Sequence, residues 1–219
     1  MQSDPAFRET VRERLRTFEV HHADRGEHRH AAVAVTLVEE GLGAQVDGLP
    51  LPDAWSTEAA LVLTRRSAAL ANHAGQWAFP GGRVDDGETI GQAALRELWE
   101  EVDLRLDETA ILGRLDDYVT RSGFVISPVV LWAGAAPNLK PNAAEVESIH
   151  RIRVAEFLRP DAPLLEPGED PARPIMRMPV GRSWIAAPTA AIIYQFCELC
   201  IAGRATRVAH FDQPLFARR

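Results

Sequence analysis

The sequence predicts one main domain with the architecture of a mixed α/β sandwich. Short apolar segments rich in β-branched residues alternate with a few amphipathic helical segments, and no linker is long enough to separate two domains. With 219 residues, 46% of them hydrophobic, the chain can bury a sizeable core. We expect the main domain over residues 31–203, after an N-terminal helix and linker (1–30) and before a C-terminal tail (204–219).

The first predicted element is an amphipathic N-terminal helix. Pro5 stands near its start, a position that tolerates proline because no backbone donor is needed there. The apolar residues recur every three or four positions: Phe7, Val11, Leu15 and Phe18. Residues 21–30 follow as a polar linker. The helix has two candidate partners, its own domain or the second subunit of a homodimer.

Apolar, β-branched segments predict the strands of the sandwich. These segments cover residues 31–40, 59–67, 111–122, 124–134, 145–154 and 175–180. Turn-rich composition predicts loops over residues 41–57 and 160–174, with a short helix at 155–159. The last long element is a helix from about 189 to 202, with Gly203 where a glycine commonly ends a helix.

Composition and charge restrict the classes of partner. The formal net charge of −7 disfavours nucleic acid, because phosphate contacts need clustered Lys and Arg. Any phosphate-bearing ligand must therefore be held by local arginines or by a metal. The two cysteines, Cys197 and Cys200, fall inside an apolar helical segment and are expected to be buried thiols rather than a zinc or redox site. No signal peptide and no apolar run of about 20 residues is present, so we expect a cytoplasmic protein without a membrane partner.

The stretch "WAFPGGRVDDGETIGQAALRELWEEVDL", residues 77–104, carries the strongest chemical signal. A tight Gly-Gly turn is expected at its start, followed by a helix over 89–102 with Thr89 as a candidate N-cap. Three glutamates, Glu97, Glu100 and Glu101, share one arc of this helix, where like charges repel by a few tenths of a kcal/mol per pair, roughly. A hard divalent cation such as Mg²⁺ would remove this repulsion.

The opposite arc of the helix is apolar and is expected to pack on the core. It holds Leu95, Leu98, Trp99 and Val102. Ala93 and Ala94 fall on the acidic side one turn earlier, where small side chains would leave room for a ligand. The alternative is a solvated acidic face, trimmed by Arg96–Glu100 and Glu101–Arg105 ion pairs.

These residues resemble the Nudix hydrolases, whose motif is Gly-x5-Glu-x7-Arg-Glu-U-x-Glu-Glu-x-Gly-U, with U apolar. The matching residues are Gly82, Glu88, Arg96, Glu97, Leu98, Glu100, Glu101 and Leu104. The motif glycine is replaced by Asp103, which we expect to end the helix in the left-handed conformation, away from the glutamates. The resemblance implies an α/β/α sandwich with a mixed sheet and hydrolysis of a diphosphate linked to another moiety.

The resemblance also implies roles for individual residues. Glu97, Glu100 and Glu101 would be ligands of Mg²⁺ or Mn²⁺, and the Gly81 carbonyl would add a further ligand. Arg96 would orient the glutamates, with Glu88 and Gly82 in supporting positions. Glu145, in the turn "KPNAAE", is a candidate base or extra ligand, and the choice of general base among these carboxylates stays open.

A second resemblance concerns the substrate. The segment "VLTRRSAALANHAGQWAFPGG", residues 62–82, is similar to the signature of coenzyme A pyrophosphatases, L-L-T-x-R-[SA]-x3-R-x3-G-x3-F-P-G-G. It departs at Ala71, where the signature has Arg. An arginine fork suits the 3′-phosphate of coenzyme A, and Arg65, Arg66 and Arg121 are candidates to compensate.

The favoured interpretation is a metal-dependent hydrolase acting on coenzyme A or an acyl-CoA, giving 4′-phosphopantetheine and 3′,5′-ADP. The same chemistry on ADP-ribose, NADH or a nucleoside triphosphate is the alternative. A nucleotide-sensing module without turnover is a rival of another class, against which the intact carboxylates argue. Trp77, Phe79 and Trp99 are expected in the core rather than against a base.

Overall fold

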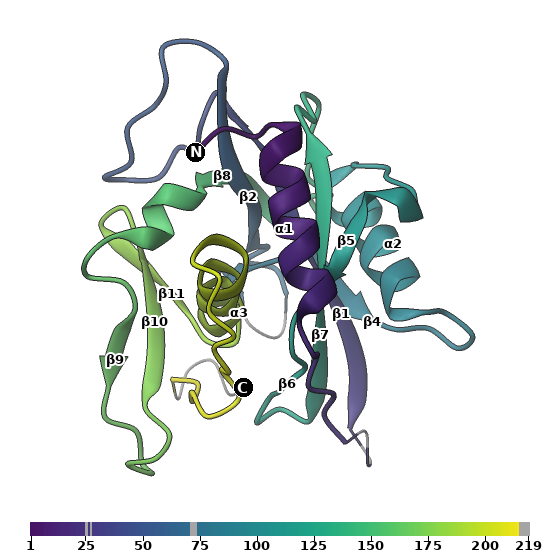
Figure 1. Cartoon of the computed structure of the whole chain (residues 1–219), viewed down its shortest axis with the longest axis vertical. Coiled ribbons are helices and arrows are strands. Elements are labelled where there is room, and N and C mark those ends of the chain that lie inside the picture. Colours follow the sequence, from purple (N-terminus) through teal and green to yellow (C-terminus); the bar gives the residue numbers. More distant parts are fainter. Residues whose placement is uncertain (25, 27, 71–73, 215–219) are drawn as a thin grey trace.

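A computed structural model of the chain describes residues 1–24, 26, 28–70 and 74–214. Its centre is a mixed sheet in which β3, β2, β1, β7 and β5 lie side by side, with β4 paired to β1, β6 to β7 and β8 to β2 (Figure 1). The strands are β1 (Arg29–Gly41), β2 (Ser56–Arg66), β3 (Trp77–Ala78), β4 (Gly81–Arg83), β5 (Ile111–Arg114), β6 (Tyr118–Val119), β7 (Phe124–Gly134) and β8 (Val146–Arg153). The β1 and β7 strands run parallel and the other pairs in the described chain are antiparallel, which confirms the predicted mixed sheet.

A smaller antiparallel sheet of three strands packs beside the first. It consists of β9 (Leu164–Glu166), β10 (Ile175–Val180) and β11 (Ser183–Ala186) in the order β11-β10-β9. Only β10 was predicted, and the expectation of loop throughout 160–174 is wrong at β9. All three residues of β9 are exposed, so the strand has no buried face that an alternating sequence pattern could reveal. The strand forms because it pairs with β10.

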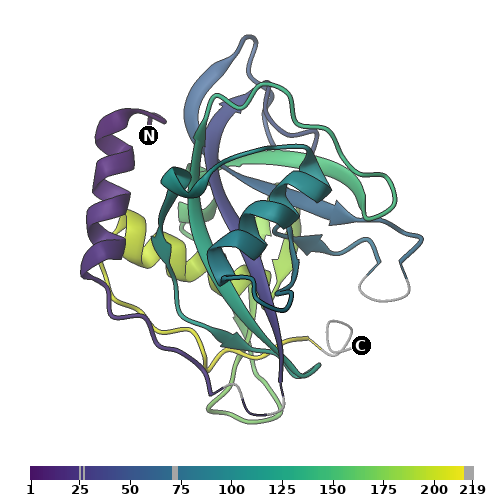
Figure 2. The ribbon, with the colours of Figure 1, turned by 90° about the vertical axis from the view of Figure 1, so that its right-hand side faces the viewer.

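Helices cover both faces of the large sheet (Figures 1 and 2). On one face lies α2 (Ile90–Val102), and on the other lie α1 (Pro5–Thr17) and α3 (Thr189–Phe196). The last of these continues as one π-helical turn, Cys197–Ile201, and ends before Gly203 at φ 72° as predicted. Short 3-10 helices cover Glu108–Ala110 and Val154–Leu158. No helix of the described residues is long and apolar enough to cross a membrane.

Strand β1 is buried on both faces because helices cover both sides of the sheet. Ala32 and Ala34 point to the α2 side, while Val35 and Leu37 point into the larger core beneath α1 and α3. The predicted strand at 31–40 is therefore confirmed, although its near-continuous burial gives it no polar face.

Helix α1 packs on its own chain. Val11 and Leu15 are buried in the larger core, and Arg14 donates a hydrogen bond to the carbonyl of Cys200 at 2.7 Å. Both cysteine side chains are buried in the same core, and burial raises the pKa of each thiol. The prediction of buried thiols is confirmed.

Strands β1 and β2 pair along only part of their length. They pair at Leu37↔Leu61, but nearer the start of β1 its partner is β4 instead, with Val33 opposite Gly81. Strand β3 pairs with β2 in turn, at Thr64↔Ala78. The segment from β3 to β4 therefore fills a split in the sheet between β1 and β2.

Both ends of α2 are capped by specific contacts. Thr89 and Gln92 form a reciprocal capping box, a feature that the sequence analysis did not identify. At the other end Asp103 adopts φ 58° and ψ 31°, which confirms the predicted left-handed cap. The backbone N–H groups of Lys140 and Asn142 donate to the carbonyls of Val102 and Glu101 at 3.0 and 2.9 Å, so a distant loop completes the cap.

Replacing Asp103 by glycine should stabilise the protein slightly. Glycine removes the cost of a Cβ in the left-handed region, about 1–2 kcal/mol, and removes a carboxylate that opposes the helix dipole. The entropy of glycine in the unfolded chain offsets part of this gain. We expect Asp103→Gly to raise Tm by roughly 1–4 °C in calorimetry and Asp103→Ala to lower it. If Tm rises equally in Asp103→Gly and Asp103→Ala, the stabilisation comes from removing the carboxylate charge rather than from the backbone conformation.

Candidate functional site

Gly81 and Gly82 lie in extended strand β4, so the expectation of a tight Gly-Gly turn is wrong. Each glycine is needed for close approach instead. A Cβ on Gly81 would stand 2.5 Å from the carbonyl oxygen of Ala32, and one on Gly82 would stand 2.3 Å from a carboxylate oxygen of Glu97. The two glycines therefore let β4 pass directly between β1 and the acidic side of α2.

The acidic side of α2 is largely buried rather than solvated. Glu97 and Glu101 are 9% and 3% exposed, and only Glu100 faces solvent. The predicted Arg96–Glu100 pair is present at 3.0 Å.

The buried stripe of α2 is rotated from the predicted one toward the carboxylates. Trp99 is 40% exposed, and the expectation that it lies in the core is wrong; the guanidinium of Arg105 stacks on its ring at 4.0 Å. Ala93 and Ala94 are fully buried against the small side chains of β1. They bring the helix close to the sheet and leave no room for a ligand, so that expectation is wrong as well.

Burial leaves the carboxylates short of compensating positive charge. Burial, with the nearby charge of Glu97, raises the pKa of Glu101 to about 8, against the opposing effects of Arg66 and a backbone hydrogen bond from Gly81. The pKa of Glu97 is also raised, mainly by burial. The charge of Glu145 contributes to both shifts. Such a cluster is a favourable place for a cation.

Arg96 organises the exposed edge of this cluster. Its guanidinium donates to Glu88 at 3.0 Å, to Glu97 at 2.8 Å and to Glu100 at 3.0 Å, and also to the backbone carbonyl of Arg83 at 2.9 Å. The hydrogen bonds to Arg96 lower the pKa of Glu88, which stays ionised. The motif arginine thus links the loop before α2, the helix itself and β4.

Glu145 reaches the cluster through the loop that caps α2. The N–H of Asn142 donates to the carbonyl of Glu101 at 2.9 Å, and the N–H of Glu145 donates to the carbonyl of Asn142 at 2.9 Å. The side chain of Glu145 is exposed, yet close enough to raise the pKa of two cluster carboxylates. Glu147, by contrast, lines a second cavity of about 490 Å³.

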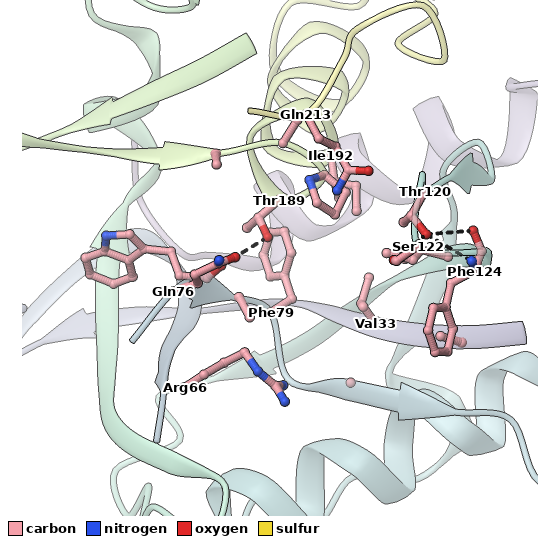
Figure 3. A pocket seen from close by; sticks show the side chains of 18 of the residues that line it. Val33, Arg66, Gln76, Phe79, Thr120, Ser122, Phe124, Thr189, Ile192 and Gln213 are labelled. Atoms are coloured by element: carbon pink, nitrogen blue, oxygen red, sulfur yellow. Dashed lines mark hydrogen bonds between the residues drawn. The ribbon is translucent and has the colours of Figure 1, made fainter. Parts of the chain in front are cut away.

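A cavity of about 540 Å³ opens beside the cluster, within the size range of small-molecule sites (Figure 3). Its floor is the face of β1, β4 and β7 that carries Val33, Gly81 and Ile126. Its other walls come from β3, β11 and the start of α3, and include Trp77, Phe79, Trp184, Thr189 and Ile192. Trp77 and Phe79 are also part of the core, as predicted. The lining is mostly apolar, with arginines at the edges.

Two of the three predicted substrate-binding arginines reach the cavity. Arg66 lines it, and its Nε is buried without a hydrogen-bond partner among the described residues. Arg65 also lines it, but its guanidinium stacks on Trp77 at 4.2 Å and donates to the Gly75 carbonyl at 2.7 Å.

Arg121, the third predicted arginine, is held in a two-pronged ion pair with buried Asp212. Its guanidinium is therefore neutralised. Position 71, where the coenzyme A signature departs, lies outside the described residues.

Arg83 was not among the predicted binding residues. Arg83 follows the motif glycines directly and lines the cavity. The available signal was strand alternation, because residues 81 and 83 of an extended strand share one face. The expectation of a turn concealed that signal.

The chemistry of the donor set fits a hard divalent cation, since carboxylate and carbonyl oxygens are the ligands that Mg²⁺ and Mn²⁺ prefer. The carboxylates around buried Glu101, which lack sufficient compensating positive charge, also favour a cation. In the present arrangement no three His, Cys, Asp or Glu side chains of the described chain converge on one point. Glu97 and Glu100 instead bind Arg96.

Gly82→Ala should weaken binding of a divalent ion while keeping the fold. The new Cβ would meet only the end of a flexible side chain, the Glu97 carboxylate, which must move. We expect Tm to change by a few degrees at most, roughly, and Mn²⁺ affinity, measured by electron paramagnetic resonance, to fall at least about tenfold. Gly91→Ala is the matched control, because its Cβ would meet a methyl group of Ile111 at 2.9 Å, outside the cluster. Unchanged Mn²⁺ affinity in Gly82→Ala would remove Glu97 from the proposed ligands.

Comparisons with known proteins relate the chain to one family. A model of the NUDIX domain matches residues 52–178, more than half of the chain. The "Uncharacterized Nudix hydrolase NudL" of Photorhabdus laumondii is 38% identical over 132 residues, 60% of this chain and 62% of that protein. The "Peroxisomal coenzyme A diphosphatase ndx-8" of Caenorhabditis elegans is 36% identical over 111 residues, 49% of this chain and 47% of that protein.

Among solved structures, a MutT/nudix family protein from Enterococcus faecalis aligns with 87% of this chain and 71% of its own, at a TM-score of 0.51 and 14% identity, which supports the fold alone. The chain spans roughly half to three fifths of the length of the curated relatives it matches. The motif from Gly82 to Glu101, the mixed sheet that carries it and the domain match establish that the chain belongs to the NUDIX family.

Proposed function

We propose that the protein is a metal-dependent hydrolase that cleaves a diphosphate linkage in a nucleoside diphosphate derivative. The observation that carries the proposal is the buried, undercompensated carboxylate cluster of Glu97 and Glu101 beside a cavity of about 540 Å³. Arg66 belongs to both, because it lines the cavity and its charge acts on Glu101. Membership of the NUDIX family supports this chemistry.

Glu97, Glu100 and Glu101, with the Gly81 carbonyl, would hold Mg²⁺ or Mn²⁺. When bound, such an ion neutralises phosphate charge and lowers the pKa of a coordinated water. Arg96 keeps three carboxylates in place through hydrogen bonds between 2.8 and 3.0 Å. The unpartnered Nε of Arg66 is available to donate to a phosphate oxygen. Glu145 is exposed and its charge acts on Glu101, so it would be the candidate to accept the proton of the attacking water.

The favoured substrate is coenzyme A or an acyl-CoA, with 4′-phosphopantetheine and 3′,5′-ADP as products. Two observations support this choice: the coenzyme A pyrophosphatase signature over residues 62–82, and the similarity to a protein named a coenzyme A diphosphatase. The cavity suits such a molecule because its apolar lining ends in arginines, which can accept a phosphate-rich nucleotide.

Glu100→Gln and Glu101→Gln should each keep the fold and lose at least about a hundredfold in kcat with Mg²⁺ or Mn²⁺, because each removes negative charge from the metal ligands. Glu13→Gln is the control, since Glu13 is an exposed helical glutamate paired with an arginine, Arg16, far from the cluster. Turnover of a substrate panel, read by mass spectrometry, measures the effect. Full activity of either cluster variant, with the metal still required, would remove that residue from the ligand set.

Substrate choice gives an independent prediction. A charge-assisted contact to the 3′-phosphate is worth about 1.5–3 kcal/mol, so kcat/KM for coenzyme A should exceed that for dephospho-CoA by roughly tenfold or more. The same panel should contain ADP-ribose, NADH and nucleoside triphosphates. Equal rates for the two coenzyme forms, or a preference for ADP-ribose, would favour the alternative substrates. Binding without turnover of any compound would favour a sensing module.

A further inference from the structure

The cavity has two chemically different ends (Figure 3). Arg66 and Gln76 lie at one end, and the charge of Arg66 acts on Glu101 of the carboxylate cluster. Thr120, Ser122 and Phe124 lie at the other end. Val33 lies between them on the floor. A ligand whose diphosphate lies by the cluster can therefore extend a second polar group to the Phe124 end.

Two arginines lie over the ring of Phe124 at this far end. The guanidinium carbon of Arg29 lies 4.1 Å from the centre of the Phe124 ring, and that of Arg83 lies 6.0 Å away. Arg29 also donates to the carbonyl of Ser122 at 3.2 Å, which orients it toward the turn before β7. Both arginine side chains are exposed, so neither is committed to the core.

The backbone that carries Arg29 and Arg83 is held by strand pairing and hydrogen bonds. Arg83 belongs to β4, which pairs with β1 opposite Ala31, and its carbonyl accepts a hydrogen bond from Arg96. Arg29 begins β1 and pairs with Phe124 across the parallel ladder. Thr120 binds the N–H of Phe124 at 2.9 Å and approaches the hydroxyl of Ser122 at 3.1 Å, which fixes the turn.

The positive charge of Arg29 and Arg83 is uncompensated within the described residues, where neither forms an ion pair with a carboxylate. Arginines nearby behave differently: Arg121, in the same turn, is tied to Asp212, and Arg96 is tied to the motif glutamates. Arg83 lines the cavity, and Arg29 lies over Phe124, which lines it too. In a chain of net charge −7, two unpaired guanidinium groups at this place create a local site for an anion.

We propose that Arg83 and Arg29, with the hydroxyls of Thr120 and Ser122, form a subsite for a phosphate monoester carried by the substrate in addition to its diphosphate. If the substrate is coenzyme A, this group is the 3′-phosphate, so the proposal rests on the proposed function and deepens it. The site takes over the role expected of the signature arginine that Ala71 replaces. A dianionic monoester with three acceptor oxygens suits two guanidinium groups and hydroxyl donors.

Direct binding tests the subsite without turnover. Metal-free protein is titrated calorimetrically with adenosine 3′,5′-bisphosphate and with 5′-AMP at low ionic strength. Wild type should bind the bisphosphate at least tenfold more tightly. Arg83→Gln and Arg29→Gln should each lose most of this preference, and Arg83→Lys should retain part of it. Arg105→Gln is the matched control, since it removes an exposed arginine stacked on an aromatic ring outside the cavity.

Kinetics provide the second readout. Arg83→Gln should lower the ratio of kcat/KM for coenzyme A to that for dephospho-CoA at least fivefold, with Tm unchanged because the side chain is exposed. An equal loss on both substrates would place Arg83 on the diphosphate and overturn the proposal. If Arg65→Gln or Arg66→Gln loses the preference for coenzyme A over dephospho-CoA and Arg83→Gln keeps it, the monoester binds at the Arg66 end of the cavity and the proposal is overturned.

The two proposals fail in different ways. Wild type that binds the bisphosphate with the expected arginine dependence, but hydrolyses no compound of the panel, overturns the proposed function and keeps the subsite. Wild type that hydrolyses coenzyme A with a ratio unaffected by Arg83→Gln keeps the function and overturns the subsite. Equal affinity of wild type for the bisphosphate and 5′-AMP also overturns the subsite.

Discussion

The close packing of α2 against β1 and β4 is the constraint on which the rest of the site depends. Alanines meet alanines between the helix and β1, and Gly82 leaves the space that the Glu97 carboxylate occupies. At this distance the carboxylates of Glu97 and Glu101 lose water without gaining enough positive charge, and their pKa values rise. A cluster of this kind is destabilising by itself, and this cost is the reason for proposing a cation site here.

The split between β1 and β2 explains how this cluster connects to the cavity. α2 and its glutamates lie on one face of the sheet, whereas the cavity floor is the opposite face. Because the β3–β4 segment fills the split, Gly81 and Gly82 border both the carboxylate cluster and the cavity. Arg66, at the end of β2, also lines the cavity while its charge acts on Glu101. Under the proposed function, the diphosphate of a ligand in the cavity would reach the carboxylates through this split rather than around the edge of the sheet.

Ion pairing decides which arginines remain available to a ligand. Almost all positive charge of the chain is arginine, and composition alone cannot rank these residues. Arg96 and Arg121 are neutralised by carboxylates, so their contribution is to hold protein segments together. Arg66 and Arg83 line the cavity, and no carboxylate of the described chain pairs with them. The charged residues that line the cavity are all arginines, in a chain whose net charge is −7.

Features that depend on a single segment could be predicted from residue spacing, whereas features that join distant segments are set by packing. Helical period and backbone preference are local, so the glutamate arc of α2, the left-handed cap at Asp103 and most strands could be predicted. The side of α2 that is buried could not be predicted, because it is set by packing against β1. As a result Trp99 is exposed. The approach of Glu145 depends on a loop docked on α2, and the availability of Arg83 rather than Arg121 depends on Asp212. Each of these outcomes is set by contacts between residues far apart in the chain, which periodicity and composition do not encode.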